Sequence, residues 1–115
     1  MTKRPDHARI RSHGRHKVDV PLSASLTRDG KPMKFSGTVL QFGPGGITAE
    51  ITADLELGQQ LALDFILPYS QVPLKIPATV RNRSAFRYGL EFQDPTPDQR
   101  SAIQRLCDTL ALLEG

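Results

Sequence analysis

The stretch that decides the fold is Val18-Asp19-Val20-Pro21-Leu22-Ser23-Ala24-Ser25-Leu26, in which apolar residues alternate with mostly polar neighbours. A period of two is typical of a β-strand with one face buried and the other exposed. The Arg28-Asp29-Gly30-Lys31 segment follows, and Asp-Gly is a strong short-range signal for a β-hairpin. The sequence therefore predicts a first strand, starting at His16, that turns back on itself as a hairpin.

The alternation recurs along most of the remaining chain. It predicts further strands over residues 35–42, 47–51, 61–67, 72–83 and 86–92. Segments rich in glycine or proline separate these runs, and such segments do not fit a helix or the centre of a sheet. Six short strands at this spacing predict an all-β fold, a six-stranded antiparallel β-barrel.

The period changes after the sixth strand. Thr96-Pro97-Asp98-Gln99 is typical of a helix start, with Thr as the cap, Pro at the first helical position and Gln three residues after the cap. One face of the predicted helix, at about residues 97–113, carries Ile103, Leu106, Cys107, Leu110 and Leu113. We expect this C-terminal α-helix to pack on an open end or side of the barrel, with packing against a partner helix as the alternative.

The first seventeen residues concentrate the positive charge. They hold six Lys or Arg residues and one acid, Asp6, so their net charge is +5 with His neutral, whereas the whole 115-residue chain carries +3. No hydrophobic period runs through residues 1–15, which predicts a flexible basic N-terminal arm before one domain over residues 16–115. Such an arm attracts phosphate groups.

The composition argues against several classes of protein. Cys107 is the single cysteine, so no disulfide framework can form, which fits a reducing compartment. No apolar run reaches the ~18 residues of a membrane span, and no apolar segment follows the basic start as in a signal peptide. We therefore expect a soluble, cytoplasmic protein.

Residues that would support catalysis or metal binding are sparse. His7, His13 and His16 lie in or beside the arm, and no cysteine or carboxylate cluster completes a set of metal ligands. Cys107 falls on the apolar helix face and is predicted to be a core residue rather than a nucleophile. We predict no enzyme activity, no metal and no cofactor.

Two motifs resemble those of the PilZ domain family. Arg11-Ser12-His13-Gly14-Arg15 matches the RxxxR motif that those domains carry in an arm before the first strand. Gln41-Phe42-Gly43-Pro44-Gly45-Gly46 aligns with their [D/N]xSxxG motif, and Tyr88-Gly89-Leu90-Glu91-Phe92 is similar to a late family strand. The resemblance covers almost the entire chain and implies the same barrel.

The resemblance implies binding of cyclic di-GMP, a bacterial second messenger with two guanines and two phosphates. Arg11 and Arg15 would hold phosphates and guanine edges, since a guanidinium grips phosphate bidentately and donates to the O6/N7 edge of guanine. Ile10 holds the position that influences, in relatives, whether one ligand or a stacked pair binds. The turn would contact guanine and ribose through Gln41, Gly43, Gly45 and Gly46.

The chain departs from the family pattern at two positions. Gln41 replaces Asp or Asn, and Gly43 replaces Ser, so the turn offers a longer amide and one hydroxyl fewer. A lost hydrogen bond costs about 0.5–1.5 kcal/mol, so two losses weaken affinity by about one to two orders of magnitude.

These features leave three functions open. The first is a stand-alone cyclic di-GMP receptor in which the ligand orders the arm and switches contact with a downstream protein. The second is a degenerate PilZ adaptor that acts by protein contacts, in motility or pilus assembly, without nucleotide. The third is single-strand nucleic-acid binding, which we do not expect because Trp is absent and the aromatic residues fall on inferred buried faces, with Phe42 as the candidate exception.

Arg81 and Arg83, on the predicted strand over residues 72–83, either border the ligand surface or lie on a solvated exterior.

Overall fold

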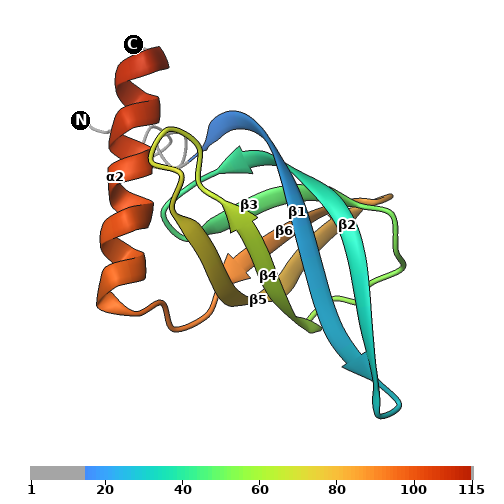
Figure 1. Cartoon of the computed structure of the whole chain (residues 1–115). Coiled ribbons are helices and arrows are strands. Elements are labelled where there is room, and N and C mark those ends of the chain that lie inside the picture. The colour runs from blue at the N-terminus through green and yellow to red at the C-terminus, as the bar shows by residue number, and fades with distance from the viewer. Residues whose placement is uncertain (1–14, 115) are drawn as a thin grey trace, which may run out of the picture.

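The computed structural model describes residues 15–114 and shows a closed six-stranded barrel with one helix beside it (Figure 1). The elements are β1 (His16–Arg28), β2 (Lys31–Phe42), β3 (Gly46–Ile51), β4 (Gln60–Ile66), β5 (Pro73–Ser84), β6 (Arg87–Phe92) and α2 (Pro97–Glu114). The order around the barrel is β1-β2-β3-β6-β5-β4, and every neighbouring pair is antiparallel. The predicted fold class is confirmed; residues 1–14 of the predicted arm lie outside the described residues.

β1 and β2 form a long hairpin whose tip extends beyond the rest of the barrel (Figure 1). Asp29 and Gly30 both have positive φ angles, 53° and 76°, as a type I′ turn requires. Because this turn has only two residues, pairing continues out to Arg28 opposite Lys31. β2 therefore begins at Lys31, and the predicted start at residue 35 was too late because residues 31–34 lack a clear alternation.

The core fills the barrel from the inward faces of all six strands. In β4, for example, Leu61, Leu63 and Phe65 are buried and the residues between them are exposed. Phe42 is also buried, 1% exposed, and its ring centroid lies 6.3 Å from that of Phe65. The suggestion that Phe42 is an exposed stacking aromatic was therefore wrong.

α2 starts at the predicted cap. Thr96 N donates to Gln99 Oε1 at 2.9 Å, and Gln99 N donates to Thr96 Oγ1 at 3.1 Å, which is a reciprocal capping box. Gln99 Nε2 also donates to Lys75 O on β5 at 2.8 Å, so the cap fastens the helix to the barrel wall. Within residues 15–114, no helix is long and apolar enough to cross a membrane.

The buried face of α2 packs on the barrel, as predicted. It consists of Ile103, Leu106, Cys107 and Leu110. Burial raises the pKa of Cys107 to about 11, with a smaller contribution from Asp108, so this thiol is neutral near pH 7. Leu113 is 61% exposed and was wrongly placed on the buried face.

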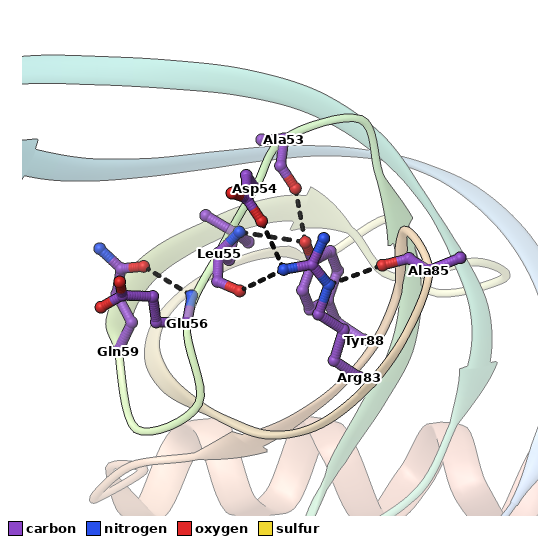
Figure 2. A network of polar contacts seen from close by, with 8 residues as sticks. All are labelled: Ala53, Asp54, Leu55, Glu56, Gln59, Arg83, Ala85 and Tyr88. Atoms are coloured by element: carbon purple, nitrogen blue, oxygen red, sulfur yellow. Dashed lines mark hydrogen bonds and ion pairs between the residues drawn. The ribbon is translucent and has the colours of Figure 1, made fainter.

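A buried tyrosine hydroxyl holds the loop between β3 and β4 (Figure 2). Tyr88 Oη donates to Ala53 O at 2.5 Å and accepts from Leu55 N at 3.1 Å, and Tyr88 is fully buried. Leu55 is itself fully buried, so this hydroxyl satisfies backbone groups that the sheet leaves without partners. Phe86, the first residue of the predicted strand over residues 86–92, is 46% exposed because it lies in the turn before β6.

Candidate ligand-binding site

The turn between β2 and β3 is fixed to β6 by its backbone. Gly43 N donates to Gly46 O at 2.9 Å, and Phe92 N donates to Gly45 O at 2.9 Å. A Cβ built on Gly46 would lie 2.1 Å from Leu90 O, whereas one built on Gly45 has no atom within 4 Å. Gly46 is therefore required by the close approach of β3 and β6, and Gly45 faces open space.

A depression of about 330 Å³ lies on the outer surface beside this turn. Its lining comprises Arg15, Gly43, Pro44, Gly45, Gly46, Arg81, Asn82, Gly89, Leu90 and Glu91. Arg15 and the three glycines of the second motif, predicted separately from the sequence, thus border one surface feature. The volume is at the small end of the range for ligand pockets, about 300–1,000 Å³, and suits part of a dinucleotide rather than the whole.

Arg15 is positioned by a residue that the sequence analysis did not single out. Arg15 Nη1 donates to Thr48 Oγ1 at 3.1 Å, and Thr48 Oγ1 donates to Gln41 Oε1 at 3.1 Å. Thr48 lies opposite Gln41 in the pairing of β3 with β2. The hydroxyl therefore connects the second arginine of the RxxxR motif to the first residue of the turn motif.

The strand register extends this connection into a row across the outer face. Lys17 is paired with Gln41, Gln41 with Thr48, Thr48 with Gly89, and Gly89 with Asn82. Because Gly89 has no side chain, the Asn82 amide occupies the space above it, and a Cβ built on Gly89 would lie 2.5–2.7 Å from that amide. The row joins a cation, two amides and a hydroxyl across five strands.

A β-bulge brings a second arginine to the same surface. In the pairing of β5 with β6, Val80 lies opposite Leu90 and Asn82 opposite Gly89, so Arg81 is the extra residue. Arg81 and Asn82 are both exposed, although neighbouring residues in a regular strand point to opposite faces. Arg81 Nε lies 2.6 Å from Glu91 Oε1, and about half of each side chain is exposed.

Gln41 also borders a second, smaller depression of about 280 Å³ on the same outer face. Lys17 and Arg87 contribute its cations, and Thr48 lies in its lining. The Arg15–Thr48–Gln41 hydrogen-bond chain therefore runs between two shallow depressions that both carry positive charge. This surface favours an anionic ligand larger than either depression alone.

Arg83 is held by hydrogen bonds within the protein and lines neither depression. Its guanidinium donates to Asp54 Oδ1, to Leu55 O at 3.1 Å and to Ala85 O (Figure 2). The hydrogen bond to Asp54 raises the pKa of Arg83. Of the two arginines that the sequence placed on one strand face, Arg81 borders the depression and Arg83 fastens the β3–β4 loop.

The remaining residues named from the sequence lie in or beside the predicted N-terminal arm. Ile10, Arg11, His7 and His13 lie outside the described residues. His16 is buried, and its Nδ1 lies 3.0 Å from Glu114 Oε2. Residues 15–114 contain no group of three or more His, Cys, Asp or Glu side chains that could hold a metal ion.

The additional residues at the depression are Thr48, Asn82, Gly89 and Glu91. The alternation of buried Ile47 and Ala49 around Thr48 could have placed its hydroxyl on the outer face. The bulge that turns Arg81 and Asn82 outward together has no comparable signal, because it depends on the offset between two strands.

The fold and this depression define a small β-barrel domain with a cationic surface site. The family model for the PilZ domain matches residues 9–109, so the chain belongs to the PilZ domain family, which comprises cyclic di-GMP receptor domains rather than enzymes.

Solved structures of PilZ proteins share the fold. The PilZ domain of CeSA from a cellulose-synthesizing bacterium is 16% identical, with a TM-score of 0.63 over 84% of this chain and 97% of that one. The Bacillus subtilis inhibitor of motility MotI/DgrA is 16% identical, with a TM-score of 0.67 over 86% of this chain and 50% of its own. YcgR from Escherichia coli, solved in complex with c-di-GMP, is 14% identical, with a TM-score of 0.68 over 87% and 46%. This chain therefore spans about half the length of MotI and YcgR. A comparison with curated proteins finds no match.

Proposed function

We propose that this domain binds cyclic di-GMP on the outer face of β2, β3 and β6, with Arg15 and Arg11 as its principal cationic contacts. The observation that carries the proposal is the position of Arg15, whose guanidinium is hydrogen-bonded to Thr48 and borders the depression beside the Gly43–Gly46 turn. Membership of the PilZ family and the c-di-GMP complex of YcgR support the choice of ligand.

The ligand would bind through the guanidinium donors of Arg15 that its contact with Thr48 leaves free. Arg15 is exposed, and its contact with Thr48 is a single hydrogen bond to a neutral hydroxyl. A phosphate offers a charge-assisted, bidentate contact, which is stronger. Arg11 would close over the same ligand and order the arm, which then presents a new surface to a downstream protein in motility, attachment or polysaccharide export.

Isothermal titration of cyclic di-GMP tests this proposal. The wild type is expected to bind saturably, and Arg15→Ala and Arg11→Ala/Arg15→Ala to lose about tenfold or more in affinity, since a charge-assisted hydrogen bond contributes about 1.5–3 kcal/mol. Arg105→Ala, on the exposed side of α2, is the matched control and should bind as the wild type does. Absence of binding, or equal loss in the Arg105 control, contradicts the proposal.

One observation favours an alternative, an adaptor that works by protein contacts without nucleotide. Gln41 and Gly43 replace the carboxylate or amide and the hydroxyl of the family motif, and Gln41 Oε1 is already occupied by Thr48. An adaptor would keep its partner when Arg15 is replaced by alanine, and adding cyclic di-GMP would not change the affinity for that partner.

A further inference from the structure

We propose that Arg81, Asn82 and Glu91 form the end of the depression that reads guanine, whereas Arg15 holds phosphate. This inference rests on the proposed function, because it assigns the two ends of the same depression to different parts of one ligand. It is carried by the bulge in β5, the Arg81–Glu91 ion pair and the Asn82 amide that lies over Gly89.

The strand register places the two ends of the depression on different strands. Arg15 is bonded to Thr48 on β3, while Arg81 and Asn82 lie on β5, with β6 between them. Neighbouring strands are about 4.8 Å apart, so the two groups are separated by about 10 Å across the sheet. Phosphate and base within one nucleotide can therefore contact opposite ends at the same time.

The charge at each end of the depression indicates which part of the ligand that end binds. Arg15 is a cation that contacts only the Thr48 hydroxyl among the hydrogen bonds of the described residues, so it attracts phosphate. At the other end, Glu91 lies 2.6 Å from Arg81 and neutralises it. A carboxylate repels phosphate, whereas a neutral nucleobase can hydrogen-bond both members of the pair. The Arg81–Glu91 end therefore favours a base.

The donor and acceptor pattern of this end fits guanine. In the described hydrogen bonds, Arg81 uses Nε and Glu91 uses Oε1, which leaves the Nη groups and Oε2 to face a ligand. An arginine only donates and a carboxylate only accepts. Guanine presents O6 and N7 as acceptors and N1–H and N2–H₂ as donors, whereas adenine presents N6–H₂ where guanine has O6.

Asn82 and Gly89 complete this end by shape. The Asn82 amide lies over Gly89, where any Cβ would approach it to 2.5–2.7 Å, so this amide covers the sheet at this end of the depression. The amide can donate or accept at the base edge beside Arg81. Glycine at position 89 thus allows the Asn82 amide to lie close to the sheet, where it can face a base edge.

Titration of three cyclic dinucleotides tests the assignment: cyclic di-GMP, cyclic di-AMP, and cyclic di-IMP, which lacks the N2 amino group of guanine. The wild type should bind cyclic di-GMP at least about tenfold more tightly than the other two, because each lacks hydrogen bonds that this end offers. Glu91→Gln should remove most of that preference, by weakening cyclic di-GMP about tenfold and cyclic di-IMP less than about twofold. Asn82→Ala should reduce the same preference by a smaller factor.

Two further variants separate the roles. Glu50→Gln, at an exposed acid on β3 that does not line the depression, should keep the wild-type affinities and preference. Arg15→Ala should weaken all three dinucleotides by the same factor, because all three carry the same phosphates.

The possible results discriminate between this inference and the proposed function. If the wild type binds cyclic di-GMP but Glu91→Gln weakens all three dinucleotides equally, or none of them, the guanine assignment is overturned and the receptor proposal stands. If the wild type binds none of the three, both are overturned. Thermal unfolding of each variant shows that the comparison is between folded proteins.

Discussion

His16 Nδ1 lies 3.0 Å from Glu114 Oε2, so the first residue of β1 is joined to the last residue of α2. His16 is buried, while half of the Glu114 side chain is exposed. The residue before His16 is Arg15, which contacts the candidate site. The contact therefore ties the start of β1, next to Arg15, to the end of α2.

A double-mutant cycle on His16→Ala and Glu114→Ala measures this contact. We expect a coupling free energy of about 0.5 kcal/mol, because one partner is half exposed. His16→Ala alone should cost more, about 1–2 kcal/mol, since it also removes a buried ring. Urea unfolding gives both values, and a coupling of zero would show that the two side chains act independently.

Tyr88→Phe should destabilise the barrel markedly although it removes one atom. The hydroxyl pairs with Ala53 O and Leu55 N, and its loss leaves two backbone groups without partners. We expect the free energy of unfolding to fall by about 1–3 kcal/mol. Tyr69→Phe, at a residue 64% exposed, is the control and should change it by less than about 0.5 kcal/mol.

Gly46→Ala and Gly45→Ala should differ strongly although they are adjacent. The new methyl group at position 46 would meet Leu90 O at 2.1 Å, whereas the one at position 45 would meet nothing. Calorimetry should show a loss of about 1–3 kcal/mol for Gly46→Ala and a near-wild-type melting temperature for Gly45→Ala. Equal melting temperatures would refute the close approach of β3 and β6.

Thr48→Val should weaken cyclic di-GMP binding without unfolding the domain, if the receptor proposal is right. Valine keeps the branched shape but cannot accept from Arg15 or donate to Gln41. We expect about a threefold to tenfold loss of affinity, the equivalent of one neutral hydrogen bond. Thr38→Val on β2 provides the control, and an equal loss there would show that the effect is not specific to the Arg15 contact.

The buried thiol of Cys107 predicts a loss of stability at alkaline pH. Its pKa is raised to about 11 in the folded state, above the ordinary value of 9.0, so the unfolded chain releases this proton first. The thiol's contribution is therefore complete below pH 9 and is lost as the pH rises to 11. A shift of this size corresponds to about 2–3 kcal/mol. Urea unfolding at pH 8 and pH 10.5 should show a steeper fall for the wild type than for Cys107→Ala, and parallel falls would contradict the prediction.

Most of the barrel could be predicted from the sequence because its strands have one buried and one exposed face. Leu61, Leu63 and Phe65 show the pattern that made β4 predictable. The prediction failed at element ends, where tertiary position overrides periodicity: Leu113, in the last turn of α2, is exposed, and Phe86 lies in a turn.

The candidate site was predictable only in part. Arg15 and the glycine turn stood out as motifs, and the structure places them around one depression. The proximity of Thr48 and Gln41 depends on the register between β2 and β3, which includes an irregularity at Leu40. Asn82 and Thr48 lie in the same row across the sheet only because both are paired with Gly89, and no spacing within the sequence contains that relation.

Because Arg81 is the extra residue of a β-bulge, deletion of a single codon could remove it from β5. Val80 is paired with Leu90 and Asn82 with Gly89, so the ladder is in register on both sides of the extra residue. Deletion of one codon would leave a regular strand and an intact barrel without the Arg81 cation, and insertion of one codon would restore it. If Arg81 reads the ligand as proposed, a change of one codon would alter ligand preference without shifting the strand pairing on either side of it.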